Sequence, residues 1–166
     1  TIPVKDKNPV AAVQDFLRRI LELEDMAGVL VPVHLGHGTP MPTLVTDPAE
    51  LDKADPLAPA FPLNGAKTVA RLTHGSSGER IAAVMRPCEI RAFIELVKLN
   101  QGRREDLVII GLDCLGAYTN TDYLHWVGED PEDATRTYCT AALSGAAPEG
   151  AAPAPACRVC EQPFPE

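Results

Sequence analysis

Apolar residues near the start of the chain recur at helical spacing and then form short continuous runs. Asn8 followed by Pro9 is typical of a helix start, because the asparagine side chain can cap the first turn and proline is tolerated there. The next apolar positions repeat every three or four residues, which predicts an amphipathic helix that ends before Gly28. Two strands are expected to follow, a buried one at residues 29–33 and a weaker one at 41–46.

The next segment alternates between irregular and helical patterns. Residues 47–62 are rich in proline and show little periodicity, which predicts a loop wrapped over the surface. Asn64 is expected to cap a second helix that runs through Arg71. A glycine- and serine-rich turn at residues 75–78 then ends this helix.

The clearest unit lies in the middle of the chain. Residues 81–85 form an apolar run typical of a buried strand, and Pro87 begins a helix with an apolar stripe. A second all-apolar strand is expected at residues 107–112. Strand, helix and strand of these lengths predict a parallel βαβ unit with a right-handed crossover. We therefore expect an α/β fold, a mostly parallel sheet flanked by helices, with its βαβ core at residues 80–113.

The last third of the chain is less regular. Asp130 followed by proline predicts one more helix, ending near Leu143, and residues 141–156 are rich in alanine, proline and glycine. The pattern indicates an α/β domain at residues 1–140, a flexible tether at 141–156 and a cysteine-bearing tail at 157–166. The chain begins with threonine rather than methionine and stops soon after its last cysteine, which suggests a piece of a longer protein.

Four cysteines are placed where they can meet. Cys88 follows the first strand of the βαβ unit and Cys114 follows the second. Parallel strands end at the same edge of a sheet, where open α/β folds bind ligands, and neighbouring strands lie only about 4.8 Å apart. The tether can then bring Cys157 and Cys160 over that edge. Four thiolates from three segments suit a 4Fe–4S cluster or a closed tetrahedral zinc site, and the spacing alone does not separate the two.

The charges around these cysteines favour a cluster. Cys88 is expected in the first turn of a helix, where free backbone N–H groups and the helix dipole stabilise a thiolate. Three arginines flank the cysteines and can offset the negative charge of a thiolate-ligated cluster: Arg86, Arg91 and Arg158.

Other interpretations of the cysteines and histidines stay open. Cys88 and Cys114 can be small buried hydrophobic residues, as free cysteines often are. Cys139, inside the last predicted helix, is expected in the core, although it can also replace one of the four ligands. His34 and His37 lie around a glycine turn and are expected to be loop residues rather than metal ligands.

The overall charge narrows the classes of partner. The chain has 15 basic and 23 acidic side chains and a formal net charge of −8, which argues against nucleic acid or an anionic membrane surface as the main partner. No apolar run approaches the roughly 20 residues of a bilayer span, so no membrane insertion is expected. The five cysteines are odd in number and clustered late, unlike a secreted disulfide framework. We therefore expect a cytoplasmic protein.

Two segments of the chain resemble a known family. Residues 85–92 (Met-Arg-Pro-Cys-Glu-Ile-Arg-Ala) and 110–116 (Ile-Gly-Leu-Asp-Cys-Leu-Gly) are similar to the beta-subunit family of coenzyme F-420-reducing hydrogenases and formate dehydrogenases. Family members carry Pro-Cys after one strand, Gly-Leu-x-Cys after the next and a later Cys-x-x-Cys. The similarity is closest at residues 81–114 and thin at 117–156. Arg86 to Glu89 and Asp113 look more like the bacterial formate-dehydrogenase-associated branch.

The resemblance implies an iron–sulfur flavoprotein that moves electrons within a redox complex. It implies FAD or FMN as a second cofactor, a deazaflavin- or nicotinamide-type electron carrier, and the other subunits of the complex as partners. Because the flavin follows from the resemblance alone, no residue is assigned to it. The main alternative is a non-catalytic module in which the cysteines hold structural zinc. In either case the ligands are the four cysteines that match the family motifs: Cys88, Cys114, Cys157 and Cys160.

Overall fold

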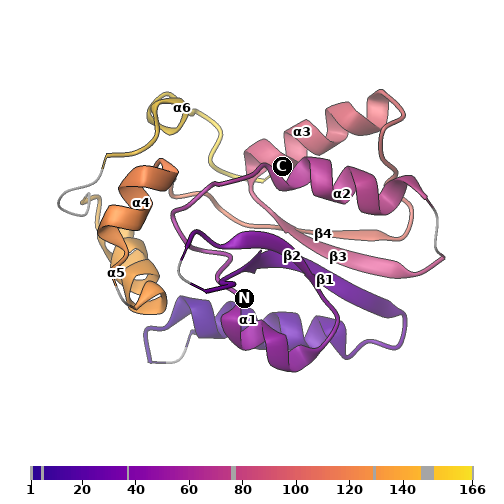
Figure 1. The fold of residues 1–166 in the computed structure, drawn as a ribbon, viewed down its shortest axis with the longest axis horizontal. Coiled ribbons are helices and arrows are strands. Elements are labelled where there is room, and N and C mark those ends of the chain that lie inside the picture. The colour runs from indigo at the N-terminus through magenta and orange to yellow at the C-terminus, as the bar shows by residue number, and fades with distance from the viewer. Residues whose placement is uncertain are drawn as a thin grey trace.

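A computed structural model shows a four-stranded sheet with helices on both faces (Figure 1). The structure describes residues 2–4, 6–36, 38–75, 78–128, 130–146 and 152–165. The elements in chain order are α1 (Pro9–Leu21), β1 (Met26–Val33), β2 (Met41–Val45), the 3-10 helix η1 (Pro48–Lys53), α2 (Gly65–His74), β3 (Arg80–Met85), α3 (Pro87–Lys98), β4 (Leu107–Gly111), α4 (Asn120–Trp126), α5 (Pro131–Leu143) and α6 (Pro155–Arg158).

The sheet confirms the predicted fold class. Its strand order is β2-β1-β3-β4; β1 pairs with β2 antiparallel and with β3 parallel, and β3 pairs with β4 parallel. Helices α2 and α3 cover one face, and α1 covers the other (Figure 1). The predicted βαβ core is therefore present, with α3 as the crossover between two neighbouring parallel strands.

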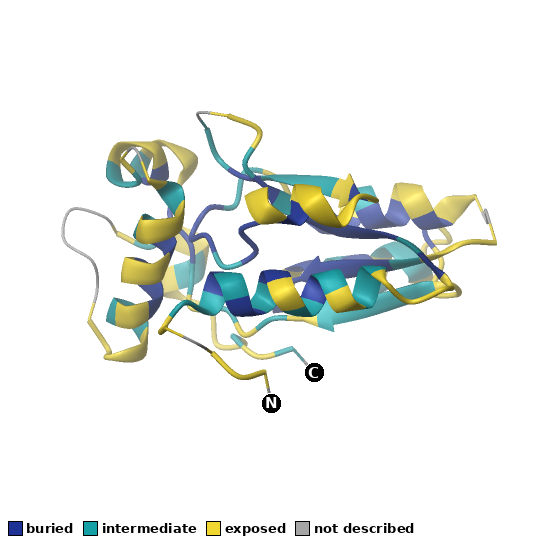
Figure 2. Ribbon diagram, turned by 90° about the horizontal axis from the view of Figure 1, so that it is seen from below, coloured by how far each residue is buried: buried dark blue, intermediate teal, exposed yellow. Residues whose placement is uncertain are grey.

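Alternation along the strands builds one apolar layer on each face. In β3, Ala82 and Val84 belong to the layer that contains Leu17 of α1, whereas Ala83 and Met85 belong to the layer that contains Phe93 of α3. Figure 2 shows the result, with buried strands between helices whose outer faces are exposed. Burial on both faces is the arrangement expected for parallel strands, and it explains why the sequences of these strands are continuous apolar runs.

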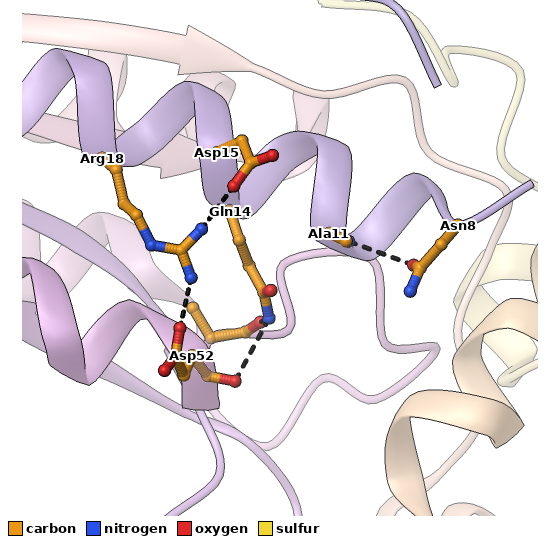
Figure 3. Close-up of polar contacts among 7 residues, drawn as sticks. Asn8, Ala11, Gln14, Asp15, Arg18 and Asp52 are labelled. Carbon is orange, nitrogen blue, oxygen red and sulfur yellow. Dashed lines mark hydrogen bonds and ion pairs between the residues drawn. The ribbon is translucent and has the colours of Figure 1, made fainter. Parts of the chain in front are cut away.

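Helix α1 is fixed at its start and along its inner face (Figure 3). The Asn8 side chain accepts a hydrogen bond from the Ala11 N–H at 3.0 Å, which confirms the predicted cap. The buried Gln14 donates to the Ala54 carbonyl at 2.7 Å and to the Asp52 carbonyl at 3.3 Å. These bonds tie α1 to the end of η1.

Two predictions for the first half of the chain are wrong. Residues 47–62 do not simply wrap over the surface, because they contain η1 and bury Leu51, Ala54 and Ala58 completely or nearly so. Gly28 does not lie just beyond the helix, which ends at Leu21, but within β1, where a Cβ atom would stand 3.0 Å from the Leu44 side chain of the neighbouring strand. The helix η1 could not be recognised from the proline content, because proline is common both in loops and in the first turn of a helix.

Helices α4 and α5 form a third packed group beside the sheet (Figure 1). The Asp130 carboxylate accepts a hydrogen bond from the Asp133 N–H, which confirms the predicted start of α5. The short helix α4 was not predicted. Side chains from both helices pack with the loops that cross the end of the sheet, in one buried cluster of Ala58, Ala60, Tyr118, Tyr123, Tyr138 and Cys139.

The predicted tether is only partly described. Residues 147–151 lie outside the described residues, and the flanking segments belong to α5 and to the chain that leads into α6. Among the described residues there is no helix with the length and apolarity needed to cross a membrane.

Candidate functional site

The ends of β3 and β4 set the positions of two cysteines. Met85 and Gly111 are paired in register, and the Leu112 N–H donates to the Met85 carbonyl at 3.0 Å. Cys88 and Cys114 each lie three residues beyond these paired positions. The structure thus brings both cysteines to the same edge of the sheet, as the βαβ argument predicted.

The turn that carries Cys88 is held by a buried glutamate. One carboxylate oxygen of Glu89 accepts from the Arg86 N–H at 2.9 Å, and the other accepts from the Gly65 N–H at 2.7 Å. A Cβ atom at Gly65 would stand 2.8 Å from this carboxylate, so only glycine fits there without a shift. The glutamate therefore joins the starts of α2 and α3 and fixes the first turn that contains Cys88.

The C-terminal segment is attached to the loop after β4 at two points. The Cys114 N–H donates to the Pro163 carbonyl at 2.8 Å, and the Ala154 N–H donates to the Ala117 carbonyl at 2.7 Å. Cys157 and Cys160 lie between these attachments, on α6 and just after it. Two backbone hydrogen bonds therefore hold the Cys-x-x-Cys segment beside Cys114.

Helix α5 supports the same loop from the other side. The Tyr138 hydroxyl donates to the Leu115 carbonyl at 2.6 Å and lies 3.0 Å from the Gly116 carbonyl. Gly116 has a φ of +98°, a conformation that favours glycine, which lets the chain turn immediately after Cys114. The loop is thus fixed by the C-terminal segment and by a buried tyrosine.

All four predicted ligands line one pocket of about 600 Å³. The pocket lies where the turn after β3, the loop after β4 and the C-terminal segment meet. Its other walls include an aromatic ring and two asparagines that sequence reasoning did not connect with the cysteines: Phe61, Asn64 and Asn120. Cys139 does not line this pocket and is buried in the cluster around α4 and α5.

The exposure of the cysteines separates them into two kinds. Cys88 and Cys160 are exposed, and Cys114 and Cys157 are half-buried. The interpretation of Cys88 and Cys114 as buried hydrophobic residues is therefore wrong, whereas the prediction that Cys139 lies in the core is confirmed. The thiols at the pocket remain accessible to a ligand.

The Cys88 thiol differs from the expectation for a helix start. Burial raises its pKa, and the negative charges of Glu89 and Cys114 add to this rise, while the Arg86 charge lowers it. Burial of the sulfur, with the two neighbouring negative charges, outweighs the stabilisation expected from the start of the helix. The effect of Cys114 on Cys88 also indicates that these two thiols are electrostatic neighbours.

The thiols share a pocket without forming a closed cage. Within the part of the chain that the structure describes, no three side chains of histidine, cysteine, aspartate or glutamate are close enough together to hold a metal ion. The four thiols therefore line the same pocket without the spacing of a preformed metal site.

The three flanking arginines have different surroundings. Arg86 lines the pocket, donates to the Ala58 carbonyl at 2.5 Å and stacks over the Phe61 ring, with 5.4 Å from guanidinium carbon to ring centroid. Arg91 is exposed, and Arg158 donates to the Pro153 carbonyl at 2.7 Å. Of the three, Arg86 is the one placed as a wall of the cysteine pocket.

His34 lies in the loop directly after β1, beside a buried carboxylate. His34 Nε2 lies 3.3 Å from the carboxylate of the buried Asp55, and this carboxylate also accepts from the Thr135 hydroxyl at 2.6 Å. His37 lies outside the described residues. Asp55 therefore joins the end of β1 to α5, a role that its place in a proline-rich stretch did not indicate.

A comparison of the sequence with models of known protein families finds no family that matches. The similarity of residues 85–92 and 110–116 to the F-420 hydrogenase and formate dehydrogenase beta subunits therefore stays a prediction. The geometry of the cysteine pocket is the main support for a function.

Proposed function

We propose that this chain is an iron–sulfur subunit that transfers electrons and holds a 4Fe–4S cluster through Cys88, Cys114, Cys157 and Cys160. The observation that carries the proposal is that these four cysteines, from three separate segments, line one pocket. Four cysteine thiols that face one pocket are suited to bind a cluster or a metal. The fifth cysteine, Cys139, is buried and does not line this pocket.

The residues present fit an anionic cluster. The pocket has four thiols that are not fully buried, a volume of about 600 Å³ and the Arg86 guanidinium in its wall. A buried Nη1 atom of that guanidinium has no hydrogen-bond partner. A positive group with a free donor suits a ligand that carries negative charge, and four thiolates around iron and sulfide are such a ligand.

Each segment has a separate part in binding. The turns after β3 and β4 fix Cys88 and Cys114 on the sheet. The C-terminal segment supplies the other two thiols, and among the described residues two backbone hydrogen bonds join it to the β4 loop. A bound 4Fe–4S cluster supplies a one-electron carrier at the rim of the sheet. Phe61 and Tyr118 add an apolar part to the wall of the pocket.

The electron partners follow from the family resemblance. We propose that electrons pass between a flavin (FAD or FMN), or a deazaflavin- or nicotinamide-type carrier, and the other subunits of a hydrogenase or formate dehydrogenase complex in the cytoplasm. The net charge of −8 supports a protein partner or small molecule rather than nucleic acid. A flavin titration checks the cofactor: quenching and retention of FAD or FMN on the chain support a flavin site, and their absence assigns the flavin to a neighbouring subunit.

Anaerobic purification tests the proposal directly. The protein is expected to be brown, to contain iron and acid-labile sulfide near four of each per chain, and to lose its broad visible absorption on reduction. A colourless protein with stoichiometric zinc and no iron or sulfide, even after anaerobic reconstitution, would contradict electron transfer. That result would leave the alternative, a structural module in which the four cysteines hold zinc.

A further inference from the structure

We propose that Arg86 is the fixed counter-cation of the cysteine pocket, and that its Nη1 group donates a hydrogen bond to the anionic group that the four cysteines hold. The inference deepens the proposed function and rests on it only in that the cysteines bind a metal or cluster. It assigns to Arg86 a positioning and tuning role, distinct from that of the thiol ligands.

The backbone of Arg86 is fixed at the edge of the sheet. The residue follows Met85, the last residue of β3, and forms the N-cap of α3. Its N–H donates to the buried carboxylate of Glu89 at 2.9 Å. The backbone position from which this side chain extends is therefore fixed, two residues before Cys88.

The guanidinium is held from two directions. Nη2 donates to the Ala58 carbonyl at 2.5 Å, and the group lies over the face of Phe61. A planar guanidinium suits both contacts at once, since it can stack on a ring while it donates in its own plane. Both partners belong to the segment between η1 and α2, which is packed against Tyr118 of the β4 loop.

A second nitrogen of the group, Nη1, is buried and has no hydrogen-bond partner among the described residues. The other buried side-chain atoms without partners, among the described residues, belong to His34, Asp55 and Tyr123, none of which lines the cysteine pocket. A buried charged donor without a partner is unfavourable, so such a group indicates a partner that arrives with a ligand. In this pocket the ligand is the thiolate-bound group.

Arg86 lies beside both cysteine-bearing turns. It lines the larger pocket together with Cys88 and Cys114. It also lines a small cavity of about 20 Å³ together with Cys114 and Cys139.

A fixed positive charge has two measurable effects on a thiolate-bound group. Four thiolates around a divalent metal carry a net negative charge, so a neighbouring cation increases metal affinity. A cluster that accepts one electron from a reductant such as dithionite becomes more negative by one unit, with no bond broken and no proton required. The cation stabilises the reduced form more than the oxidised form and raises the reduction potential.

Arg91 provides a matched control. It lies one turn further along the same helix, carries the same charge, is exposed and does not line the cysteine pocket. Replacing Arg86 or Arg91 by glutamine changes the net charge of the chain equally. A difference between the two variants therefore reports the position of the charge and not its loss.

The first measurement is a titration of the reduced, metal-free protein with Co²⁺, followed by the absorption of the thiolate complex. We expect Arg86→Gln to weaken Co²⁺ binding by about tenfold, because one charge-assisted hydrogen bond is lost, and Arg91→Gln to bind as the wild type does. Equal affinities for the Arg86→Gln and Arg91→Gln variants would overturn the proposal. So would failure of the wild-type protein to bind Co²⁺ through its thiols.

The second measurement is the reduction potential of the reconstituted cluster. A tenfold loss in the equilibrium constant for one-electron reduction corresponds to a fall of about 59 mV in Arg86→Gln, with no comparable fall in Arg91→Gln. If the wild-type protein takes up zinc but no cluster, the proposed function fails, and the Co²⁺ titration still decides the role of Arg86. Equal potentials in a chain that does hold the cluster overturn the role of Arg86 alone.

A lysine variant keeps the test valid if Arg86→Gln does not fold, as judged by circular dichroism. Arg86→Lys retains the charge and loses the planar group that meets Ala58 and Phe61 together. We expect Co²⁺ affinity about threefold below that of the wild type, since part of the hydrogen bond is lost. Wild-type affinity in Arg86→Lys, with a wild-type potential, would contradict the hydrogen bond from Nη1.

Discussion

Cys139 is chemically different from the other four cysteines. It is buried in the α4–α5 cluster, and burial, with the nearby charge of Asp55, raises its pKa to about 11. Below that pKa almost all of Cys139 is the unreactive thiol, and reactivity increases only as the pH approaches 11. We expect iodoacetamide at pH 7.5 to modify Cys139 at least tenfold more slowly than Cys160 in the metal-free protein. Alkylation mapped by mass spectrometry over time checks this, and equal rates would contradict the buried position.

Single residues also show where the sequence was informative. The positions of Cys88 and Cys114 followed from strand ends, because both lie a short distance after apolar runs that could be recognised. The difference between Arg86 and Arg91 could not be predicted from the sequence. It depends on Ala58 and Phe61, which come from a segment that has no periodic pattern and is folded under the pocket.

At the scale of elements, a buried polar contact joins α5 to the segment that follows η1. The Thr135 hydroxyl donates to Asp55 at 2.6 Å, in a site where the remaining carboxylate oxygen has no partner among the described residues. Removing the hydroxyl leaves a buried carboxylate with one donor fewer. We expect Thr135→Val to lower the free energy of unfolding by about 1–3 kcal/mol, measured by urea denaturation.

Thr140 is the control for that prediction. It lies on the same helix, is exposed, and its hydroxyl donates only within the helix, to the Arg136 carbonyl. Thr140→Val is expected to change the stability by less than about 0.5 kcal/mol. Equal losses in the two variants would indicate an effect of valine on helix formation rather than loss of the contact with Asp55.

The elements that were predicted well are those with strong local signals. Helices α1, α2 and α5 begin at asparagine or aspartate caps that the sequence makes visible, and the strands of the βαβ core are continuous apolar runs. Helix α4 has only seven residues, and its buried side is formed mainly by Tyr123. Seven residues make about two turns, too few for a clear apolar period, and the helix packs against Tyr118 and Tyr138.

For the whole molecule, the C-terminal segment is the part whose position the sequence left open. A linker of the observed length permits many positions, and the one adopted depends on the hydrogen bonds of Cys114 to Pro163 and of Ala154 to Ala117. Gly111 contributes as well, since a Cβ atom there would stand 2.6 Å from Pro165. The absence of a side chain at Gly111 therefore lets Pro165 pack against the end of β4.

Metal binding should join these distant parts and stabilise the fold as a whole. Cys88 and Cys114 belong to the sheet edge, whereas Cys157 and Cys160 belong to a segment held there by two backbone hydrogen bonds. A ligand that binds only the folded chain at a hundredfold excess over its dissociation constant stabilises it by about 2.7 kcal/mol. For a chain of this size we expect Tm to rise by roughly 5–11 °C on loading with Co²⁺.

For each variant, the rise is the Tm of the Co²⁺-loaded protein minus the Tm of the metal-free protein. This difference tests which cysteines bind the metal, because an effect of the substitution on the stability of the metal-free fold cancels. Cys88→Ser and Cys160→Ser should each lose most of the rise, because a closed site loses one of only four ligands. Cys139→Ser should keep it, since Cys139 does not line the pocket. Its burial means that Cys139→Ser can start from a lower Tm, and subtracting the metal-free value removes that difference. A rise that vanishes in Cys139→Ser and persists in Cys114→Ser would show that the metal binds elsewhere and that the sheet edge is not its site.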